Sequence, residues 1–261
     1  MRRFVTVMAV LATVIFLFAA HTYWKGKTSA GTKAPAVTEE AVKNVKEKEE
    51  NVESKSANQD LLTLADNWPD QAKEGLEKAM EEGRAYKVAV VGSGSLGEEN
   101  GGWSVMLRDA LGEAFGDHVE VGIFEYDERS DEFISNSRHN EVAEFEPDFV
   151  LFEPFTLMDN GNVEVEDNHE NIQTFVDAVR EAVVVLQPPH PIHDATFYPA
   201  QVNDLKTFAE DEDLVYLDHW PEWPDVEDEE LRSYLQEDQG APNEKGHELW
   251  FEYLKGYFIA E

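Results

Sequence analysis

The sequence of 261 residues contains no cysteine. Disulfide bonds, thiolate zinc sites, a cysteine nucleophile and a lipid-modified N-terminal cysteine are therefore all excluded. Basic residues are also scarce, because 21 Lys and Arg stand against 55 Asp and Glu, which gives a formal net charge of −34. A chain of this charge repels phosphate backbones, so we expect no nucleic-acid partner.

Only one apolar run is long enough to cross a bilayer, and it lies at the N-terminus. Arg2 and Arg3 precede the uncharged run of residues 4–20, and the aromatic residues Tyr23 and Trp24 follow it. Positive charge before such a run favours a cytoplasmic N-terminus. We therefore predict that residues 1–24 form a membrane anchor or a signal segment, with the rest of the chain outside the cytoplasm.

The stretch that follows has a different composition. Residues 25–58 consist largely of Lys, Glu, Ser and Thr with almost no large apolar side chain. A segment of this composition cannot bury enough apolar surface to fold, so we predict a disordered linker. The remaining residues 59–261 have the length of one domain that buries a sizeable core.

Within this domain, short apolar runs alternate with helical patterns. Strands are predicted at 86–92, 118–126, 147–155, 183–189 and 214–220. Helices are predicted at 58–84 with a break near Pro69, and at 101–115, 168–182, 201–213, 228–238 and 244–260. This alternation predicts a parallel sheet covered by helices on both faces, with right-handed crossovers. The ligand site of such a sheet lies beyond the carboxyl ends of its strands.

The strand-end segments carry a resemblance. In this order, "GSGSLGEENGGW", "EPFTLMDNGN", "QPPHPIH" and "DHWPEWP", together with the C-terminal "APNEKGHELW", resemble the SGNH/GDSL hydrolase superfamily over residues 85–259. The resemblance implies a three-layer α/β/α flavodoxin-like fold, with a five-stranded parallel sheet in the order 2-1-3-4-5. It also implies hydrolysis of an ester or acyl group by a serine nucleophile.

The family's nucleophile lies in a Gly-Asp-Ser-like turn after the first strand. Here that motif aligns with Gly92-Ser93-Gly94, so a glycine stands where the family has its nucleophile, with Ser93 before it and Ser95 after it. Because a loop after a strand can shift a side chain by one residue, the resemblance implies Ser95 as the nucleophile and Ser93 as its reserve. The alternative is a turn whose hydroxyl groups only cap the following helix.

The family stabilises its oxyanion with backbone N–H groups and an asparagine amide. The candidates here are Gly94 in the nucleophile turn, Gly102 or the neighbouring Gly101 for the second motif, and Asn160 for the third. A glycine lets a backbone N–H approach an oxyanion closely, but both loops also fit a helix N-cap and an Asx turn. Glu153, at the end of the third strand, is a separate residue of interest. A carboxylate there lies at the mouth of the site, where burial would raise its pKa.

The general base is the point of departure from the family. Ala241 stands before Pro-Asn, where the family has histidine, and Asp238 stands three residues earlier. A methyl group cannot accept a proton, so another imidazole has to serve. We predict His247 as the base and Asp238 as the group that orients it.

Other histidines come from strand-end loops and are alternatives for the same role. His193 and His219 are the reserves, and His190 lies on the same loop as His193. For each of them, and for His247, a structural or solvent-facing role is the competing interpretation.

No cofactor or metal is predicted. The sequence has no Walker loop, "GSGSLG" is not the Gly-x-Gly-x-x-Gly of dinucleotide-binding folds, and the acidic stretches lack calcium-loop spacing.

Two functions remain open. One is an extracytoplasmic hydrolase acting on ester or O-acyl groups of a small molecule or an envelope glycan. The other is a catalytically degenerate SGNH fold that serves as a binding or scaffolding module at the cell surface. They are distinguished by whether a serine Oγ and a histidine nitrogen come together at the strand ends.

We predict that the anchor stays on the mature protein. Cleavage after Ala20 would place Phe18 where a signal peptidase requires a small residue. Edman sequencing of the exported protein should therefore read Met1 or Arg2. A mature N-terminus near His21 would contradict the anchor.

Overall fold

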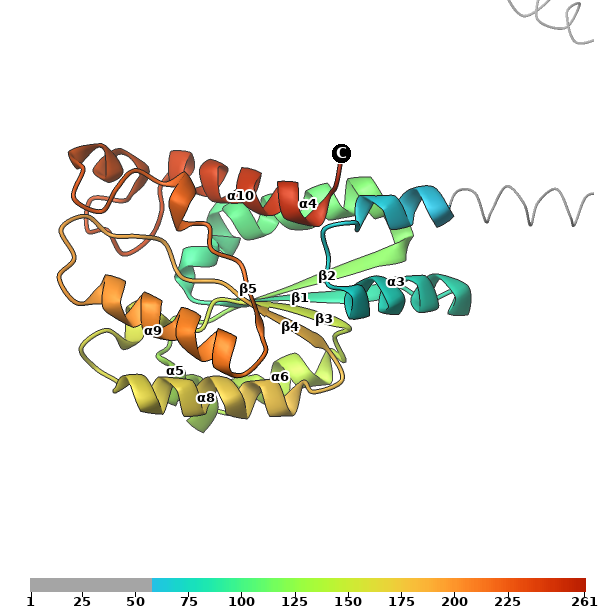
Figure 1. The fold of residues 1–261 in the computed structure, drawn as a ribbon, viewed down its shortest axis with the longest axis horizontal. Coiled ribbons are helices and arrows are strands. Elements are labelled where there is room, and N and C mark those ends of the chain that lie inside the picture. Colours follow the sequence, from blue (N-terminus) through green and yellow to red (C-terminus); the bar gives the residue numbers. More distant parts are fainter. Residues whose placement is uncertain (1–57) are drawn as a thin grey trace, which may run out of the picture. The chain divides into compact units, whose positions relative to one another are not determined.

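The computed structural model describes residues 58–261, and the predicted anchor and nearly all of the predicted linker lie outside them. One sheet of five parallel strands forms the centre (Figure 1). Its strands are β1 (Tyr86–Gly92), β2 (Val119–Glu125), β3 (Phe149–Phe152), β4 (Val183–Leu186) and β5 (Val215–Tyr216). They follow the order β2-β1-β3-β4-β5, which confirms the predicted topology.

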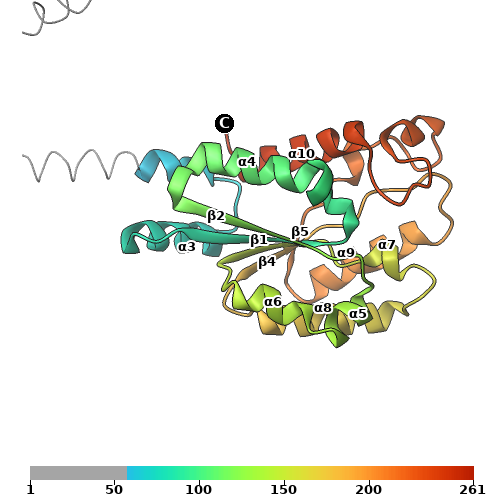
Figure 2. The ribbon, with the colours of Figure 1, turned by 180° about the vertical axis from the view of Figure 1, so that it is seen from behind.

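Both faces of the sheet are covered by helices, as the continuous apolar runs of the strands require. In β1, Val88 and Val90 belong to one core cluster, whereas Ala89 and Val91 belong to the other. The first face is covered by α3 (Asp70–Glu82), α4 (Trp103–Phe115) and α10 (Glu244–Phe258), and the second by α5 (Ser130–Ser135), α6 (Arg138–Glu144), α8 (Val165–Ala178) and α9 (Tyr198–Asp211). Figures 1 and 2 show the two helical layers on either side of the strands.

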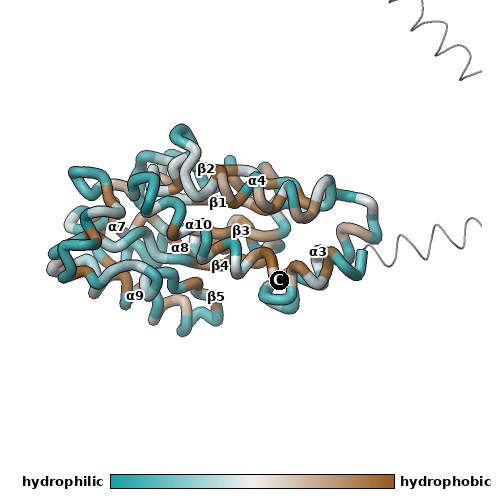
Figure 3. The backbone as a smooth tube through the Cα atoms, turned by 90° about the horizontal axis from the view of Figure 1, so that it is seen from above, coloured by the Kyte–Doolittle hydropathy of each residue, from teal (hydrophilic) through white to brown (hydrophobic). Residues whose placement is uncertain are grey.

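Hydropathy follows this layering. In Figure 3 the hydrophobic stretches gather around the strands at the centre of the view, whereas the outer loops are largely hydrophilic. The Trp68 side chain joins the two ends of the described chain, because its indole N–H donates to the carbonyl of Phe258 at 2.9 Å. The same ring packs against Tyr86, Phe115 and Phe149.

Helix ends agree with the predicted signals in part. The break near Pro69 separates a helix at 58–64 from α3, and Gly83 ends α3 in the left-handed conformation with φ of 68°. The predicted helix 228–238 is instead a 3₁₀ helix, Glu229–Tyr234. Three short helices, α5, α6 and α7 (Thr156–Asp159), lie in segments without a helical prediction, because their few turns carry too little periodicity.

A buried carboxylate joins α7 to two of the helices on the second face. Asp159 is 2% exposed and accepts hydrogen bonds from the backbone N–H of Ser130 at 2.9 Å and from the Asn168 amide at 2.7 Å. The Ser130 hydroxyl donates to its second oxygen. These contacts tie α7 to the beginning of α5 and of α8.

We expect Asp159→Ala to destabilise the domain by about 3 kcal/mol, because several buried donors lose their charged acceptor. Urea unfolding followed by circular dichroism measures this. Glu170→Ala is the matched control, since Glu170 is an exposed carboxylate on α8 and should change stability by less than about 0.5 kcal/mol. An unfolding midpoint of Asp159→Ala equal to that of the control would contradict the role of Asp159.

Candidate active site

Two loops at the carboxyl edge of the sheet bring a serine and a histidine together. The 3₁₀ turn Gly94–Leu96 after β1 carries Ser95, and the loop after β4 carries His190. Ser95 Oγ lies 3.2 Å from His190 Nδ1. Both residues are buried, with Ser95 2% and His190 0% exposed. The distance is short enough for direct proton transfer between the two groups.

The second nitrogen of His190 decides which proton moves. His190 Nε2 lies 3.0 Å from the backbone carbonyl oxygen of Gln239. A carbonyl only accepts, so Nε2 carries the hydrogen and Nδ1 presents its lone pair to the Ser95 hydroxyl. Burial lowers the pKa of His190 to about 4, although the Gln239 carbonyl acts in the opposite direction. The imidazole is therefore neutral at pH 7 and free to accept a proton.

The predicted base, His247, does not meet Ser95. Its Nδ1 accepts the backbone N–H of Trp103 at 3.3 Å. Its ring packs so closely on Gly97 and Gly102 that a Cβ on either glycine would come within 3 Å of it. Burial lowers the pKa of His247 to about 4. This histidine completes the packing at the N-terminus of α4, and the histidine in contact with Ser95 is His190.

Asp238 does not orient an imidazole. It is exposed, and its Oδ1 accepts the N–H of Gly240 at 3.0 Å. The neighbouring Gln239 has the left-handed φ of 59°, which directs its carbonyl towards His190. A backbone carbonyl one residue after the predicted aspartate therefore takes over the orienting role.

The reserve histidines serve other contacts. His219 accepts the indole N–H of Trp223 at Nδ1, at 2.8 Å, and donates from Nε2 to the Pro188 carbonyl, also at 2.8 Å. Both of its nitrogens are thus occupied. The two ring nitrogens of His193 are buried without a hydrogen-bond partner among residues 58–261, and its nearest carboxylate oxygen belongs to Asp194, at 3.4 Å. Neither ring is paired with Ser95.

The three predicted oxyanion donors differ in whether they are free to bind an oxyanion. The Gly102 N–H donates to Gly97 O at 2.7 Å, so it is already used within the turn. Gly94 is exposed, and its N–H makes no hydrogen bond within residues 58–261. Asn160 follows α7, and in the described part of the chain no hydrogen bond joins its side chain to the Ser95 turn. Of the three, Gly94 remains available to an oxyanion.

Ser93, the reserve nucleophile, is a buried part of the same turn. Its Oγ accepts the Ser95 N–H at 3.3 Å, which confirms the capping role that the Gly/Ser pattern left open. Its own backbone N–H donates to Glu153 Oε2 at 2.7 Å.

The C-terminal motif that carries the resemblance is a helix cap. The side-chain oxygen of Asn243 accepts the N–H groups of Lys245 and Gly246. The side-chain NH₂ of Asn243 donates to two backbone carbonyls of the preceding segment. A Cβ on Gly246 would lie 2.2 Å from Tyr234 O, so only glycine fits. The Pro-Asn-x-x-Gly pattern thus fixes the start of α10 whether or not a histidine precedes it.

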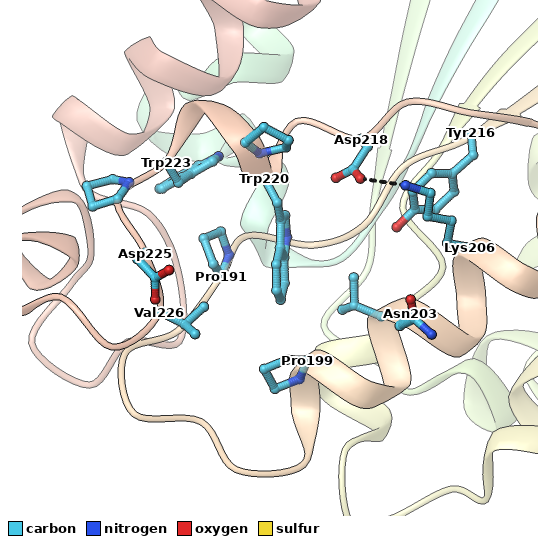
Figure 4. Close-up of a pocket in the computed structure, with 13 residues that line it drawn as sticks. Pro191, Pro199, Asn203, Lys206, Tyr216, Asp218, Trp220, Trp223, Asp225 and Val226 are labelled. Carbon is cyan, nitrogen blue, oxygen red and sulfur yellow. Dashed lines mark hydrogen bonds and ion pairs between the residues drawn. The ribbon is translucent and has the colours of Figure 1, made fainter.

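A pocket of about 580 Å³ adjoins the loop that carries His190. Pro191, the residue after His190, forms one wall, and α9 forms another. Figure 4 shows the Trp220 ring standing between Pro191 and Asn203, with the Lys206–Asp218 ion pair beyond it. The Trp220 indole N–H donates to the Pro189 carbonyl at 2.7 Å, which ties the ring to the same loop. The pocket combines an aromatic face with polar groups on its rim.

Residues 58–261 hold no group of three or more His, Asp or Glu side chains arranged to bind a metal ion. Sequence reasoning placed His190 near the site but ranked it below His247. Its one signal was its position on a strand-end loop, which it shared with His193 and His219.

The fold of the described chain is similar to that of several solved structures. The chain is similar to a GDSL-like lipase from Bacteroides thetaiotaomicron, with 12% identity, 70% of this chain and 96% of that chain covered, and a TM-score of 0.51. It is similar to a variant of an acetylxylan esterase from Geobacillus stearothermophilus, with 12% identity, coverage of 67% and 94%, and a TM-score of 0.55.

A psychrotrophic esterase from a Pseudoalteromonas species is similar as well, with 17% identity, coverage of 65% and 94%, and a TM-score of 0.50. No family model matches the chain, and neither does any curated protein. The described chain therefore has the SGNH/GDSL hydrolase fold, as the strand-end motifs predicted.

Proposed function

We propose that this protein is a serine ester hydrolase in which Ser95 is the nucleophile and His190 the general base. The observation that carries the proposal is the 3.2 Å contact between Ser95 Oγ and His190 Nδ1, with Nε2 bound to the Gln239 carbonyl. A serine beside a neutral imidazole of defined tautomer is the minimum that acyl transfer requires.

The reaction follows from this geometry. Ser95 Oγ attacks the ester carbonyl carbon while its proton passes to His190 Nδ1, and the carbonyl oxygen becomes an oxyanion facing the Gly94 N–H. Collapse expels the alcohol, which takes the proton back from His190 and leaves an acyl group on Ser95. Water then attacks this acyl group, again giving a proton to His190, and the acid leaves as Ser95 recovers its hydrogen.

The orienting group lowers the expected rate. A carboxylate stabilises the imidazolium that forms during proton transfer by its full charge, whereas the Gln239 carbonyl offers only a dipole.

The Gln239 side chain also accepts the backbone N–H of His193 at 2.7 Å, so residues 236–241 cover the histidine loop. A substrate therefore reaches Ser95 only after this segment moves aside.

The substrate is an O-acyl ester on a sugar. The pocket beside Pro191 supports this class, because the Trp220 ring suits the apolar face of a pyranose. Asn203 and the Lys206–Asp218 pair offer a donor and acceptors for its hydroxyl groups.

The protein acts outside the cytoplasm, held at the membrane by residues 1–24. The apolar run at 4–20 and the preceding Arg2 and Arg3 support this location. Within residues 58–261 no helix has the length and apolarity of a membrane span.

A second candidate function is a binding module that has kept the fold without catalysis. The burial of Ser95 and the alanine at position 241 favour it. In that case the Trp220 pocket binds a glycan, while the Ser95–His190 contact is a structural hydrogen bond.

Turnover of p-nitrophenyl acetate separates the two functions. We expect Ser95→Ala to lower kcat/KM at least about a thousandfold, and His190→Gln about a hundredfold or more, because nucleophile and base are lost. Ser135→Ala, an exposed serine on α5, is the control for the first variant. His247→Gln is the comparison for the second and should retain most of the activity. Turnover that persists in Ser95→Ala, or no labelling of the wild-type chain by a serine-directed phosphonate, favours the binding module.

The substrate class has its own test. Asn203 is exposed and its side chain makes no hydrogen bond within the described residues, so Asn203→Ala should leave the fold intact. With an O-acetylated oligosaccharide we expect this variant to raise KM about fivefold, the value of one lost hydrogen bond. Its KM for p-nitrophenyl acetate should not change. Asp204→Ala, exposed on the same helix but outside the pocket, is the control. An equal KM for the oligosaccharide in wild type and Asn203→Ala argues against a sugar in this pocket.

A further inference from the structure

A buried carboxylate lies next to the nucleophile turn and has no part in the reaction described above. Glu153 follows β3, and its N–H donates to Val91 O, which extends the pairing of β3 with β1. The residue is 0% exposed. A carboxylate is rarely buried at a strand end without a partner, so its contacts define its role.

Glu153 is connected to Ser95 through Ser93. Glu153 Oε2 accepts the Ser93 N–H at 2.7 Å, and Ser93 Oγ accepts the Ser95 N–H at 3.3 Å. A Cβ on Gly92 would lie 2.8 Å from the same carboxylate oxygen, so the absence of a side chain at Gly92 lets the carboxylate fold over the end of β1. Glu153 Oε1 has no hydrogen-bond partner among residues 58–261.

We infer that Glu153 is a positioning residue for the nucleophile: its ionised carboxylate holds the Ser93 N–H and so fixes the turn that presents Ser95 to His190. This inference rests on the proposed hydrolase function. A carboxylate accepts a backbone N–H more strongly than a neutral carboxylic acid does. The turn is therefore held best when Glu153 is charged.

The environment of Glu153 makes this charge depend on pH near neutrality. Burial raises the pKa of Glu153 to about 7, although hydrogen bonding to Ser93 acts against the shift. The charge of Asp159 on α7 raises the pKa of Glu153 further. Burial raises the pKa of Tyr198 on α9, and the charge of Glu153 in turn raises it further. Activity should therefore rise as the pH passes 7. The base, with the pKa of His190 at about 4, titrates well below this range.

Stability should change in the opposite direction. The folded chain keeps a proton on Glu153 up to about pH 7, whereas the unfolded chain releases it near the ordinary value of 4.5. Between these values the folded state binds more protons, so the contribution of Glu153 to stability falls as the pH rises through this window. A gain in activity that accompanies a loss in stability identifies a buried charge kept for function.

The test is Glu153→Gln in the full chain, with Glu144→Gln as the control, because Glu144 is exposed at the end of α6. Glutamine has the same shape and still accepts the Ser93 N–H, but it carries no charge. At pH 8 we expect kcat on p-nitrophenyl acetate to fall about tenfold while the melting temperature rises. The inflection of kcat near pH 7 should disappear, and the control should keep it. A merely structural glutamate would not produce this combination.

A readout without turnover accompanies the kinetics. Selective ¹⁵N-serine labelling follows the amide signals of Ser93 and Ser95 from pH 5 to 9. We expect the Ser93 signal to titrate near pH 7 in the wild-type chain and in Glu144→Gln, but not in Glu153→Gln. Amide signals that stay unchanged in the wild type, or an inflection of kcat near pH 7 that survives in Glu153→Gln, overturn the inference. A titrating Ser93 amide in a chain that hydrolyses no ester supports the hold on the turn and overturns the hydrolase proposal alone.

Discussion

The site depends on the register of the parallel strands. β1 pairs with β3, and β3 pairs with β4, so the carboxyl ends of these three strands lie next to one another at one edge of the sheet. The turn after β1 presents Ser95, the end of β3 presents Glu153, and the loop after β4 presents His190. Residues separated by up to 95 positions in the chain thus meet within hydrogen-bonding distance. A slip of one residue in either pairing would turn these side chains towards opposite faces.

The electrostatics of the site differ from those of a triad with a carboxylate on the imidazole. The hydrogen-bonding partner of His190 Nε2 is a backbone carbonyl, so the imidazole is oriented by a dipole in a fully buried position. This combination keeps the ring neutral and makes it a weak base. The buried carboxylate of the site is Glu153, which contacts the nucleophile turn instead of the histidine. The carboxylate therefore contacts the turn that carries the serine, while a backbone carbonyl sets the tautomer of His190.

The C-terminal segment has two separate tasks that the resemblance joins into one motif. Asn243 and Gly246 build the beginning of α10, and this cap is complete with an alanine at position 241. Residues 236–241 form a tight turn, in which the Gln236 N–H donates to the Ala241 carbonyl and Gln239 faces the histidine loop. The cap holds the segment that leads out of this turn, and the turn contacts His190 and His193.

The sequence by itself determined the architecture of this protein. Apolar runs such as 86–92 and the glycines and prolines that end them are local signals, and their alternation with helical periodicity allows few topologies. The same signals placed Ser95, Glu153 and the histidine loops at one edge of the sheet. Ser95 was identifiable because it lies in the turn after the first strand.

Only the tertiary structure decided which histidine faces Ser95. Residue order favoured His247, because it lies nearest to Ala241, whereas His190, His193 and His219 share only a position on a strand-end loop. Their roles follow from contacts between segments far apart in the chain. His247 accepts the Trp103 N–H, His219 donates to the Pro188 carbonyl, and the Gln239 carbonyl accepts from His190 and leaves Nδ1 facing the serine. The left-handed φ of Gln239 that directs this carbonyl has no signature in the residue type, because glutamine rarely adopts it. Such choices depend on packing between distant segments, which residue spacing along one chain does not encode.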